Sequence, residues 1–292
     1  MDSERIKRGL AHLLAGVALA SAAILPAGAA ERQGPDVRIG WTAWSDAEVI
    51  SKLTALVLSK VGMDVELTLA DVSAQYRGLA ENDLDVMLMS WQPQTHAGYL
   101  RRYGDRIEDL GPLYGGADLG LAVPTYVDSS IRTIGDLAGA AERFDRHIEG
   151  IDEGAGLMDR AHEAMTAYGL RDWELASGSG PRMALRLNEA IERQQPIVVT
   201  AWRPHWKWAA FDLRYLKDPE GVFKGEEAVH AMAREGFSGD QPKVAAFLER
   251  MQFELDELET LMAEARDKGH RTAIREWLNA NGERVTRWLE GD

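Results

Sequence analysis

Tryptophan recurs in three short segments that each lead into a polar or proline-containing loop. The segments are Trp41-Thr42-Ala43-Trp44, Ser90-Trp91-Gln92-Pro93 and Ala201-Trp202-Arg203-Pro204. An indole face attracts a ligand cation by roughly 0.5–2 kcal/mol, depending on how completely the cation is desolvated. A quaternary ammonium group has no strong hydrogen bond to donate, so aromatic faces suit it well. The pattern favours a site for a methylated cation; the alternative is that these side chains fill the core, the usual role of a single tryptophan.

The sequence around these tryptophans alternates short apolar runs with helical patterns, which is typical of an α/β protein. Strands are predicted at 37–41, 64–69, 85–90, 120–124, 146–151, 173–177, 196–201 and 229–233, and helices at 45–61, 73–82, 156–168, 181–193, 240–252, 254–268 and 270–290. Ligands of open α/β sheets bind beyond the carboxyl ends of the strands. The turns after Trp41, Ser90, Ile151 and Ala201 are therefore the expected site.

Two features of the chain indicate how these elements are organised. Ser45 is expected to be the N-cap of the helix at 45–61, with Glu48 at the capping-box position. Two α/β sets follow one another without a long linker, which indicates two lobes that face a ligand cleft. We expect lobe one at residues 36–123 plus 228–292 and lobe two at 124–227, so the chain crosses twice between them.

Five longer motifs carry a family resemblance over nearly the whole chain after residue 35. They are GWTAWSDAEV (40–49), DLDVMLMSWQPQTH (83–96), LAVPTYV (121–127), GIDEGAGLM (150–158) and VVTAWRPHWKWAAFDLRYLKDP (198–219). With them the chain resembles the glycine betaine/choline-binding proteins of ABC importers, the OpuAC-like family. The resemblance implies a two-lobed, type II periplasmic binding protein.

The resemblance also implies which residues bind the ligand. A cage of tryptophans is expected from Trp44, Trp91 and Trp202. The ligand carboxylate is expected to meet the backbone N–H groups of Gly150 and Ile151 and the side chain of His96. Backbone N–H groups near a helix N-terminus form an anion site on general grounds.

Four further residues are candidates because the chain departs from the family pattern near them. Trp41 either replaces Trp44 in the cage or stacks behind it. Asp46 stands where choline-binding relatives use an acidic residue to meet a hydroxyl; the alternative is an acid favoured by the helix dipole. Tyr114 is a candidate substitute for the aromatic that some choline binders add near residues 119–120, here Leu-Gly; the alternative is that it packs at the cleft rim. His205 lies near the site in sequence.

Together these observations predict the substrate-binding component of an ABC importer for glycine betaine, working with a membrane permease. Choline, carnitine, trimethylamine N-oxide and dimethylsulfoniopropionate are alternative ligands, and a ligand-sensing module for a receptor is an alternative function. No HExxH, GxSxG or P-loop motif occurs, so an enzyme is not expected. Neither a cofactor nor a metal is expected, and we expect a monomer. The net charge of −14 argues against nucleic acid as a partner.

The first residues of the chain have the pattern of a cleavable signal peptide. Arg5, Lys7 and Arg8 precede an apolar run from Gly9 to Leu25, and Ala27-Gly28-Ala29 supplies the small residues of a cleavage site. An uncleaved membrane anchor is the alternative. The sequence has no cysteine to accept a lipid, so a free periplasmic protein is expected.

Overall fold

The computed structural model describes residues 34–291, where nine strands form one mixed sheet. The strands are β1 (Val37–Trp41), β2 (Val65–Leu69), β3 (Val86–Gln92), β4 (Ile107–Pro124), β5 (His147–Glu149), β6 (Glu174–Ala176), β7 (Val199–Arg203), β8 (Leu213–Tyr215) and β9 (Glu227–Arg234). The strand order is β2-β1-β3-β9-β4-β7-β5-β6, and β8 pairs with β4. The predicted α/β class is confirmed.

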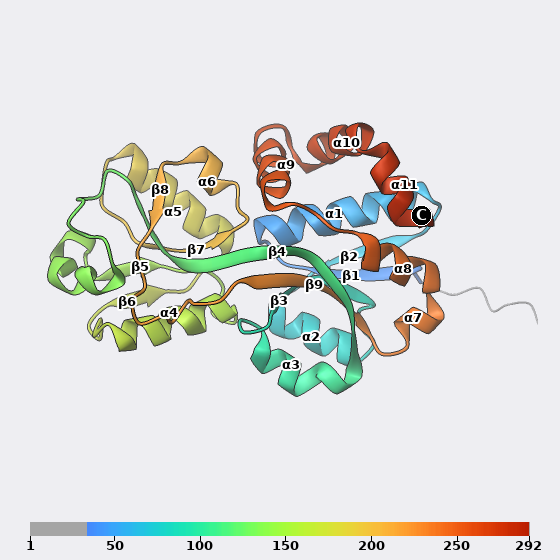
Figure 1. The fold of residues 1–292 in the computed structure, drawn as a ribbon, viewed down its shortest axis with the longest axis horizontal. Coiled ribbons are helices and arrows are strands. Elements are labelled where there is room, and N and C mark those ends of the chain that lie inside the picture. Colours follow the sequence, from blue (N-terminus) through green and yellow to red (C-terminus); the bar gives the residue numbers. More distant parts are fainter. Residues whose placement is uncertain (1–33, 292) are drawn as a thin grey trace, which may run out of the picture. The chain divides into compact units, whose positions relative to one another are not determined.

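Helices pack around these strands (Figure 1). They are α1 (Ser45–Lys60), α2 (Val72–Ala80), α3 (Ala97–Tyr103), α4 (Gly156–Ala167), α5 (Gly180–Glu192), α6 (Lys207–Ala210), α7 (Phe237–Asp240), α8 (Pro242–Arg250), α9 (Leu255–Lys268), α10 (His270–Ala280) and α11 (Gly282–Glu290), with two 3-10 segments, η1 (Gly104–Arg106) and η2 (Ile134–Phe144).

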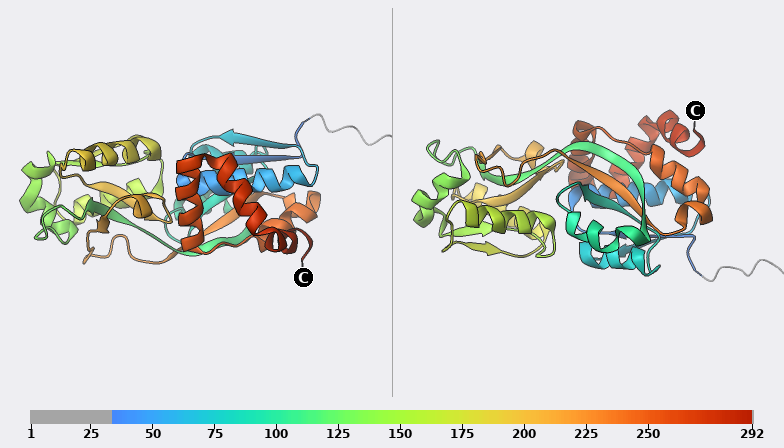
Figure 2. Two further views of the ribbon diagram at one scale, coloured as in Figure 1. Left: turned by 90° about the horizontal axis from the view of Figure 1, so that it is seen from above. Right: turned by 60° about the horizontal axis from the view of Figure 1, so that its bottom comes forward.

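Two neighbouring strands connect the two lobes of the fold. Residues 107–117 of β4 pair with β9, and residues 118–122 of the same strand pair with β7. The elements around β1, β2 and β3 make up lobe one, and those around β5, β6 and β7 make up lobe two. Figures 1 and 2 show β4 and β9 running side by side between the two groups. The division at 36–123 plus 228–292 and 124–227 stays a prediction; strand β4 changes its pairing partner between Ala117 and Asp118.

The buried apolar residues form a larger group, which extends from lobe one into lobe two, and a smaller group within lobe two. In lobe one, Ile39 of β1, Val86 of β3 and Leu53 of α1 are wholly buried in the larger group. The smaller group belongs to lobe two and includes Leu121 and Ile148. Burial of apolar surface contributes roughly 25 cal/mol per Å², so each lobe has a hydrophobic core that can hold its share of the pocket in place.

The structure differs from the sequence-based expectation in several elements. Strand β4 begins at Ile107 rather than at residue 120, because its pairing with β9 continues through three register shifts around Pro112 and Tyr114. Glycine and proline in that stretch hide the strand pattern in the sequence. Helix α3 and strand β8 were not expected. The single helix predicted at 270–290 is two helices, which meet at Asn281.

The expected capping box at the start of α1 is wrong. Trp44 is the N-cap residue, and its carbonyl accepts a hydrogen bond from the Glu48 N–H at 2.8 Å. Ser45 is already the first helical residue. Its hydroxyl lies 3.2 Å from Nε2 of His205 in lobe two, so a contact between the lobes uses the group that was expected to cap the helix.

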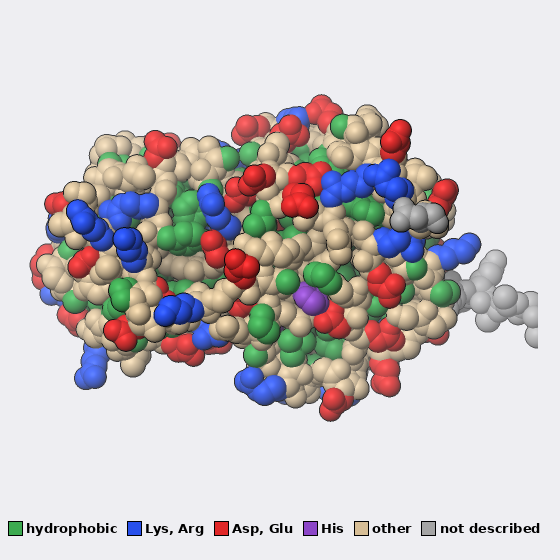
Figure 3. Space-filling model, in the orientation of Figure 1, with side chains coloured by type: hydrophobic (Ala, Val, Ile, Leu, Met, Phe, Trp, Pro, Cys, Tyr) green, Lys and Arg blue, Asp and Glu red, His purple; other side chains and the backbone are tan. Residues whose placement is uncertain are grey.

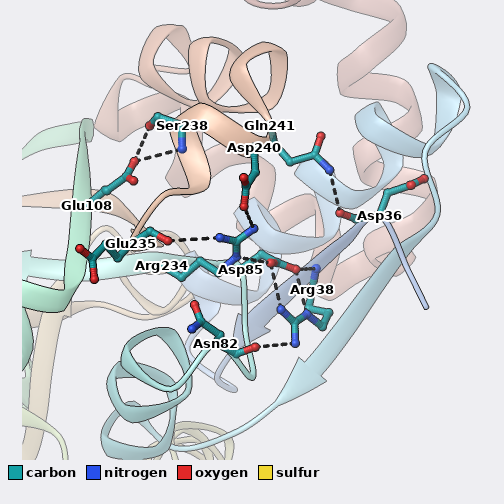
Figure 4. Close-up of polar contacts among 10 residues, drawn as sticks. All are labelled: Asp36, Arg38, Asn82, Asp85, Glu108, Arg234, Glu235, Ser238, Asp240 and Gln241. Atoms are coloured by element: carbon teal, nitrogen blue, oxygen red, sulfur yellow. Dashed lines mark hydrogen bonds and ion pairs between the residues drawn. The ribbon is translucent and has the colours of Figure 1, made fainter. Parts of the chain in front are cut away.

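A buried carboxylate ties three strands of lobe one together (Figure 4). Asp85 precedes β3, and its Oδ2 accepts hydrogen bonds from the backbone N–H and Nε of Arg38 at 2.8 and 2.9 Å. Its Oδ1 accepts from Nε of Arg234 at 2.8 Å, and Arg234 donates in turn to Asp240 at 2.8 Å. Burial alone raises the pKa of Asp85, but the hydrogen bonds from the two arginines outweigh it and hold the pKa below its ordinary value.

We expect Asp85→Asn to lower the free energy of unfolding by about 2–4 kcal/mol, because it leaves two partly buried guanidinium groups without their counter-charge. Urea unfolding measures this. The folded pKa of Asp85 lies below the unfolded value of about 3.9, so the stabilisation is present above that pH and is lost as the pH falls through the folded pKa. An equally steep loss of stability in acid for the variant and the wild type would contradict this role.

Candidate ligand-binding site

A narrow pocket lies between the lobes, with about 270 Å³ of space, part of it open to solvent. Its lining residues are Trp44, Trp91, Thr95 and His96 from lobe one, Ile151, Ala155, Gly156, Leu157 and Trp202 from lobe two, and Leu119 from β4. An occupant of this pocket meets mostly aromatic and aliphatic walls. The structure brings all three predicted cage tryptophans to this pocket.

Two of these tryptophans are held by carboxylates of the opposite lobe. Trp44 donates a hydrogen bond from Nε1 to Oδ2 of Asp152 at 3.0 Å. Trp202 donates from Nε1 to Oδ1 of Asp46 at 3.2 Å. Since Trp44 and Asp46 belong to lobe one and Trp202 and Asp152 to lobe two, each lobe fixes the indole that the other contributes.

The third tryptophan and the histidine leave two hydrogen-bond donors unused. Nδ1 of His96 accepts from the backbone N–H of Trp91 at 3.1 Å, so the proton of a neutral ring lies on Nε2. Burial lowers the pKa of His96 to about 3, which keeps the ring neutral. Among the described residues, neither Nε2 of His96 nor Nε1 of Trp91 has a hydrogen-bond partner, although both are buried. Buried donors in native proteins are nearly always paired.

The first turn of α4 forms another wall of the pocket. Gly156 and Leu157 line it, and none of the described hydrogen bonds uses their N–H groups. Such N–H groups at a helix N-terminus favour an anion. Ile151 also lines the pocket, and its N–H has only the weakly accepting sulfur of Met158 at 3.3 Å.

Gly150 is not among the lining residues. Its N–H donates to the carbonyl of Ala176 at 2.9 Å. A side chain at this position would come within 2.6 Å of Met158 and 2.7 Å of the Ala176 carbonyl oxygen. The glycine therefore permits close packing of the turn.

The four other candidate residues lie outside the pocket lining. Trp41 stands in β1 with Nζ of Lys52 at 5.2 Å from its ring centroid. Asp46 is wholly buried and accepts from the hydroxyl of Tyr114 at 2.7 Å. Burial raises the pKa of Asp46, and the hydrogen bonds from Tyr114 and Trp202 act against that rise. His205 contacts Trp202 with the two rings nearly perpendicular and 4.6 Å between centroids. Asp46 and His205 thus contact a wall of the pocket from behind.

Several residues could not be assigned to the site from the sequence alone. Asp152 holds Trp44, and Thr95 and Leu157 line the pocket. Gly156 was expected only as the first residue of a helix. It approaches the Thr95 carbonyl so closely that a Cβ would overlap that oxygen and lie 2.6 Å from Thr95 Cγ2. The motif GIDEGAG contains both Asp152 and Gly156, but a contact across the cleft is visible only in the fold.

The charges, side-chain clusters and helices of the described residues bear on two other kinds of site, a metal site and a membrane-spanning segment. Figure 3 shows acidic and basic side chains interspersed over the visible face. Within residues 34–291 no cluster of three or more histidine, aspartate or glutamate side chains has the arrangement of a metal site. In the same part of the chain, no helix has the length and apolar character needed to cross a membrane. The predicted signal peptide at 1–29 falls outside the described residues.

We expect the His96 ring to keep its proton on Nε2 and stay neutral from pH 8 down to pH 5. Its pKa of about 3 lies below the ordinary value, so protonation costs the folded protein stability as the pH falls below the unfolded pKa of about 6.5. Nitrogen chemical shifts of the labelled imidazole measure the tautomer and the titration. A midpoint near pH 6.5 would contradict the buried, neutral state.

Comparisons with known proteins identify relatives of this chain. A glycine betaine/carnitine transport binding protein, GbuC of Listeria monocytogenes, is 33% identical over 153 residues, which are 51% of this chain and 51% of that protein. The match therefore spans about half the length of that relative.

Among solved structures, lactococcal OpuAC in its closed conformation with glycine betaine has a TM-score of 0.81 and 28% identity, over 87% of this chain and 99% of its own. A choline-binding protein of an ABC transporter, in complex with choline, has a TM-score of 0.82 and 25% identity, over 87% and 91% of the two chains. These neighbours share the two-lobed, type II fold of periplasmic binding proteins.

The family model described as the substrate binding domain of the ABC-type glycine betaine transport system matches residues 35–280. That match covers most of the chain. Proteins of this kind bind a substrate for transport and are not enzymes. The chain therefore belongs to the OpuAC family of substrate-binding proteins.

Proposed function

We propose that this protein captures glycine betaine for an ABC importer, in a cage formed by Trp44, Trp91 and Trp202. The trimethylammonium group stacks against the indole faces, where each face contributes roughly 0.5–2 kcal/mol. Asp46 and Asp152 keep two of the indoles oriented by accepting hydrogen bonds from their N–H groups. The aromatic walls therefore need no ion pair with the ligand.

The single observation that carries this proposal is the pair of buried donors without acceptors, Nε2 of His96 and Nε1 of Trp91. Both belong to residues that line the pocket. A buried donor left unpaired costs roughly 1–3 kcal/mol, so a ligand that supplies acceptor oxygens removes a standing cost. A carboxylate supplies such oxygens beside a cationic head, which describes a betaine.

The carboxylate end of the ligand has further donors on lobe two. The N–H groups of Ile151, Gly156 and Leu157 border the pocket, and a carboxylate is a far stronger acceptor than the sulfur of Met158 that Ile151 now meets. Gly150 was expected to donate as well. Because its N–H already bonds to Ala176, its part in the proposed site is to let the turn pack closely.

Capture proceeds by closure of the lobes, because neither lobe alone completes the pocket. Contacts that join the lobes support this view: Tyr99 donates from its hydroxyl to the carbonyl of Gly154 at 2.9 Å, and Arg160 donates to the side chain of Gln94 at 3.2 Å. A ligand that touches both lobes stabilises the closed form by its difference in affinity for the two states. The closed form is the one that the permease recognises.

Other methylated osmolytes are the alternative ligands. Choline is supported by the similarity to a choline-binding protein and opposed by Leu119, an aliphatic side chain where some choline binders carry an aromatic one. Carnitine and trimethylamine N-oxide also carry a trimethylated cationic nitrogen, and dimethylsulfoniopropionate carries a dimethylated cationic sulfur in its place. A sensing module for a receptor needs the same pocket and differs only in its partner.

The proposed working place is the periplasm, where the protein acts as a free monomer beside its permease. The basis is the signal-peptide pattern of residues 1–29 and the absence of cysteine from the sequence. It follows from this proposal that the protein and its importer support growth under osmotic stress.

Calorimetric titration with glycine betaine and with choline tests the ligand assignment. We expect Trp91→Ala to weaken betaine binding by about 30-fold or more, because it removes an indole face and a donor. We expect His96→Ala to weaken betaine by about tenfold or more and to affect choline less, because a charged acceptor then loses its donor.

Two variants outside the pocket serve as controls. Trp41→Ala removes an indole of the neighbouring segment, and His162→Ala removes an exposed histidine of α4; both should leave the affinities within about twofold. Strong choline binding that is indifferent to His96 would move the assignment to choline. Absence of heat with wild-type protein and betaine would remove the betaine assignment.

Closure has its own test at Gly156. We expect Gly156→Ala to weaken betaine binding by about tenfold or more, because a Cβ there meets backbone and side chain of Thr95 across the cleft. The ligand-free variant should unfold within about 1 kcal/mol of the wild type. Gly139→Ala is the matched control, since nothing lies within 4 Å of its Cβ position. Equal affinities of the two variants would show that the lobes bind the ligand without this close approach.

A further inference from the structure

Lys207 is a fully buried lysine that stands against a wall of the pocket. Its Nζ lies 3.9 Å from the ring centroid of Trp202, the residue is 0% exposed, and Nζ has no hydrogen-bond partner among the described residues. An atom that approached the indole in the plane of the ring would be kept more than 3.9 Å from the centroid by the ring's own atoms. The ammonium therefore covers one face of Trp202, and only the other face is available to a ligand.

The charged groups around Lys207 come from several elements. Burial lowers its pKa well below the ordinary range, while Asp46 of α1, Glu259 of α9 and Asp118 of β4 act in the opposite direction. Two of these acids have other partners: Glu259 lies 3.7 Å from Arg203, and Asp118 accepts from the hydroxyl of Tyr215 at 2.6 Å.

Both side-chain partners of Asp46, Tyr114 and Trp202, are neutral, and Trp202 is also the ring that Lys207 covers. His205 next to Lys207 is buried, and burial, aided by the lysine, lowers its pKa so that it adds no charge. Trp202 thus has a carboxyl group at its N–H edge and an amino group on its covered face. Burial opposes the charged form of both groups, while the nearby Asp46 favours the protonated form of Lys207.

We propose that Lys207 makes the pocket selective for a zwitterion over a simple cation. A cationic head on the free face of Trp202 lies about 8 Å from Nζ, since it stacks at roughly 4 Å on the side opposite to the lysine. Little water screens two like charges across a buried ring, so the repulsion is felt. Choline meets this repulsion with a net positive charge, whereas a betaine also carries a carboxylate and is neutral overall.

The inference rests on the proposed function, and one pair of variants tests it separately. Lys207→Met and Lys207→Gln both remove the charge and keep an unbranched aliphatic stem, with a side chain shorter than that of lysine by one atom. We expect each to tighten choline binding by about tenfold or more and to change betaine binding by less than about threefold, measured by calorimetry at neutral pH. Two variants of different polarity guard against a folding defect in one of them, and thermal unfolding verifies that each is folded.

Lys52→Met is the matched control. Lys52 also places its Nζ over an indole, at 5.2 Å from Trp41, but that ring does not line the pocket. Its removal should leave the ratio of choline to betaine affinity unchanged. The same shift of the ratio in this variant would overturn the inference, because a change of overall charge would then explain it.

The remaining outcomes separate this inference from the ligand assignment. An unchanged ratio in both Lys207 variants overturns the inference and leaves the betaine assignment intact. Equal weakening of both ligands also overturns it and makes Lys207 a counter-charge that helps Asp46 hold Trp202. If the wild type binds no betaine but the variants gain choline affinity, the inference stands and the betaine assignment falls. If no form of the protein binds either ligand, both fall.

Discussion

The pocket depends on two hydrogen bonds from indole N–H groups to carboxylates that cross between the lobes. Trp44 is held by Asp152 and Trp202 by Asp46, so the orientation of each aromatic wall is set by the lobe that does not carry it. An indole whose N–H meets a carboxylate is also polarised toward a more electron-rich ring. The same contacts therefore orient the walls and favour a cation between them.

Unpaired polar groups gather around these walls. Of the buried side-chain atoms without a partner in the described residues, Nε2 of His96 and Nε1 of Trp91 belong to the pocket lining, and Nζ of Lys207 lies behind Trp202. Each such group lowers the stability of the folded chain. Buried polar groups without a partner are expected mainly at functional sites, such as a ligand-binding pocket. The buried apolar residues of the two lobes supply the stability that tolerates them.

The elements of the site were predictable from the sequence, whereas its cross-lobe contacts were not. Periodicity and strand-end placement identify the strands that carry Trp91 and Trp202, and the family motifs single out His96. Asp152 and Gly156 act across the cleft, and Lys207 acts from behind a ring. Trp44 and Asp152, for example, are 108 residues apart in the sequence. No local pattern encodes such a contact. The capping box at Ser45 was mispredicted for the same reason, since His205 of the other lobe takes its hydroxyl.

The irregular pairing of β4 with β9 has a mechanical consequence for the pocket. The register shifts lie between Asp109 and Ala117, where β4 leaves lobe one, and Tyr114 sits within this stretch with its hydroxyl on Asp46. Asp46 in turn holds the indole of Trp202. Through one phenol and one carboxylate, the irregular stretch of the crossing strands is therefore linked by hydrogen bonds to an indole of the pocket wall. The orientation of that indole thus depends on backbone geometry in the strands that join the lobes, as well as on the residues around the ring.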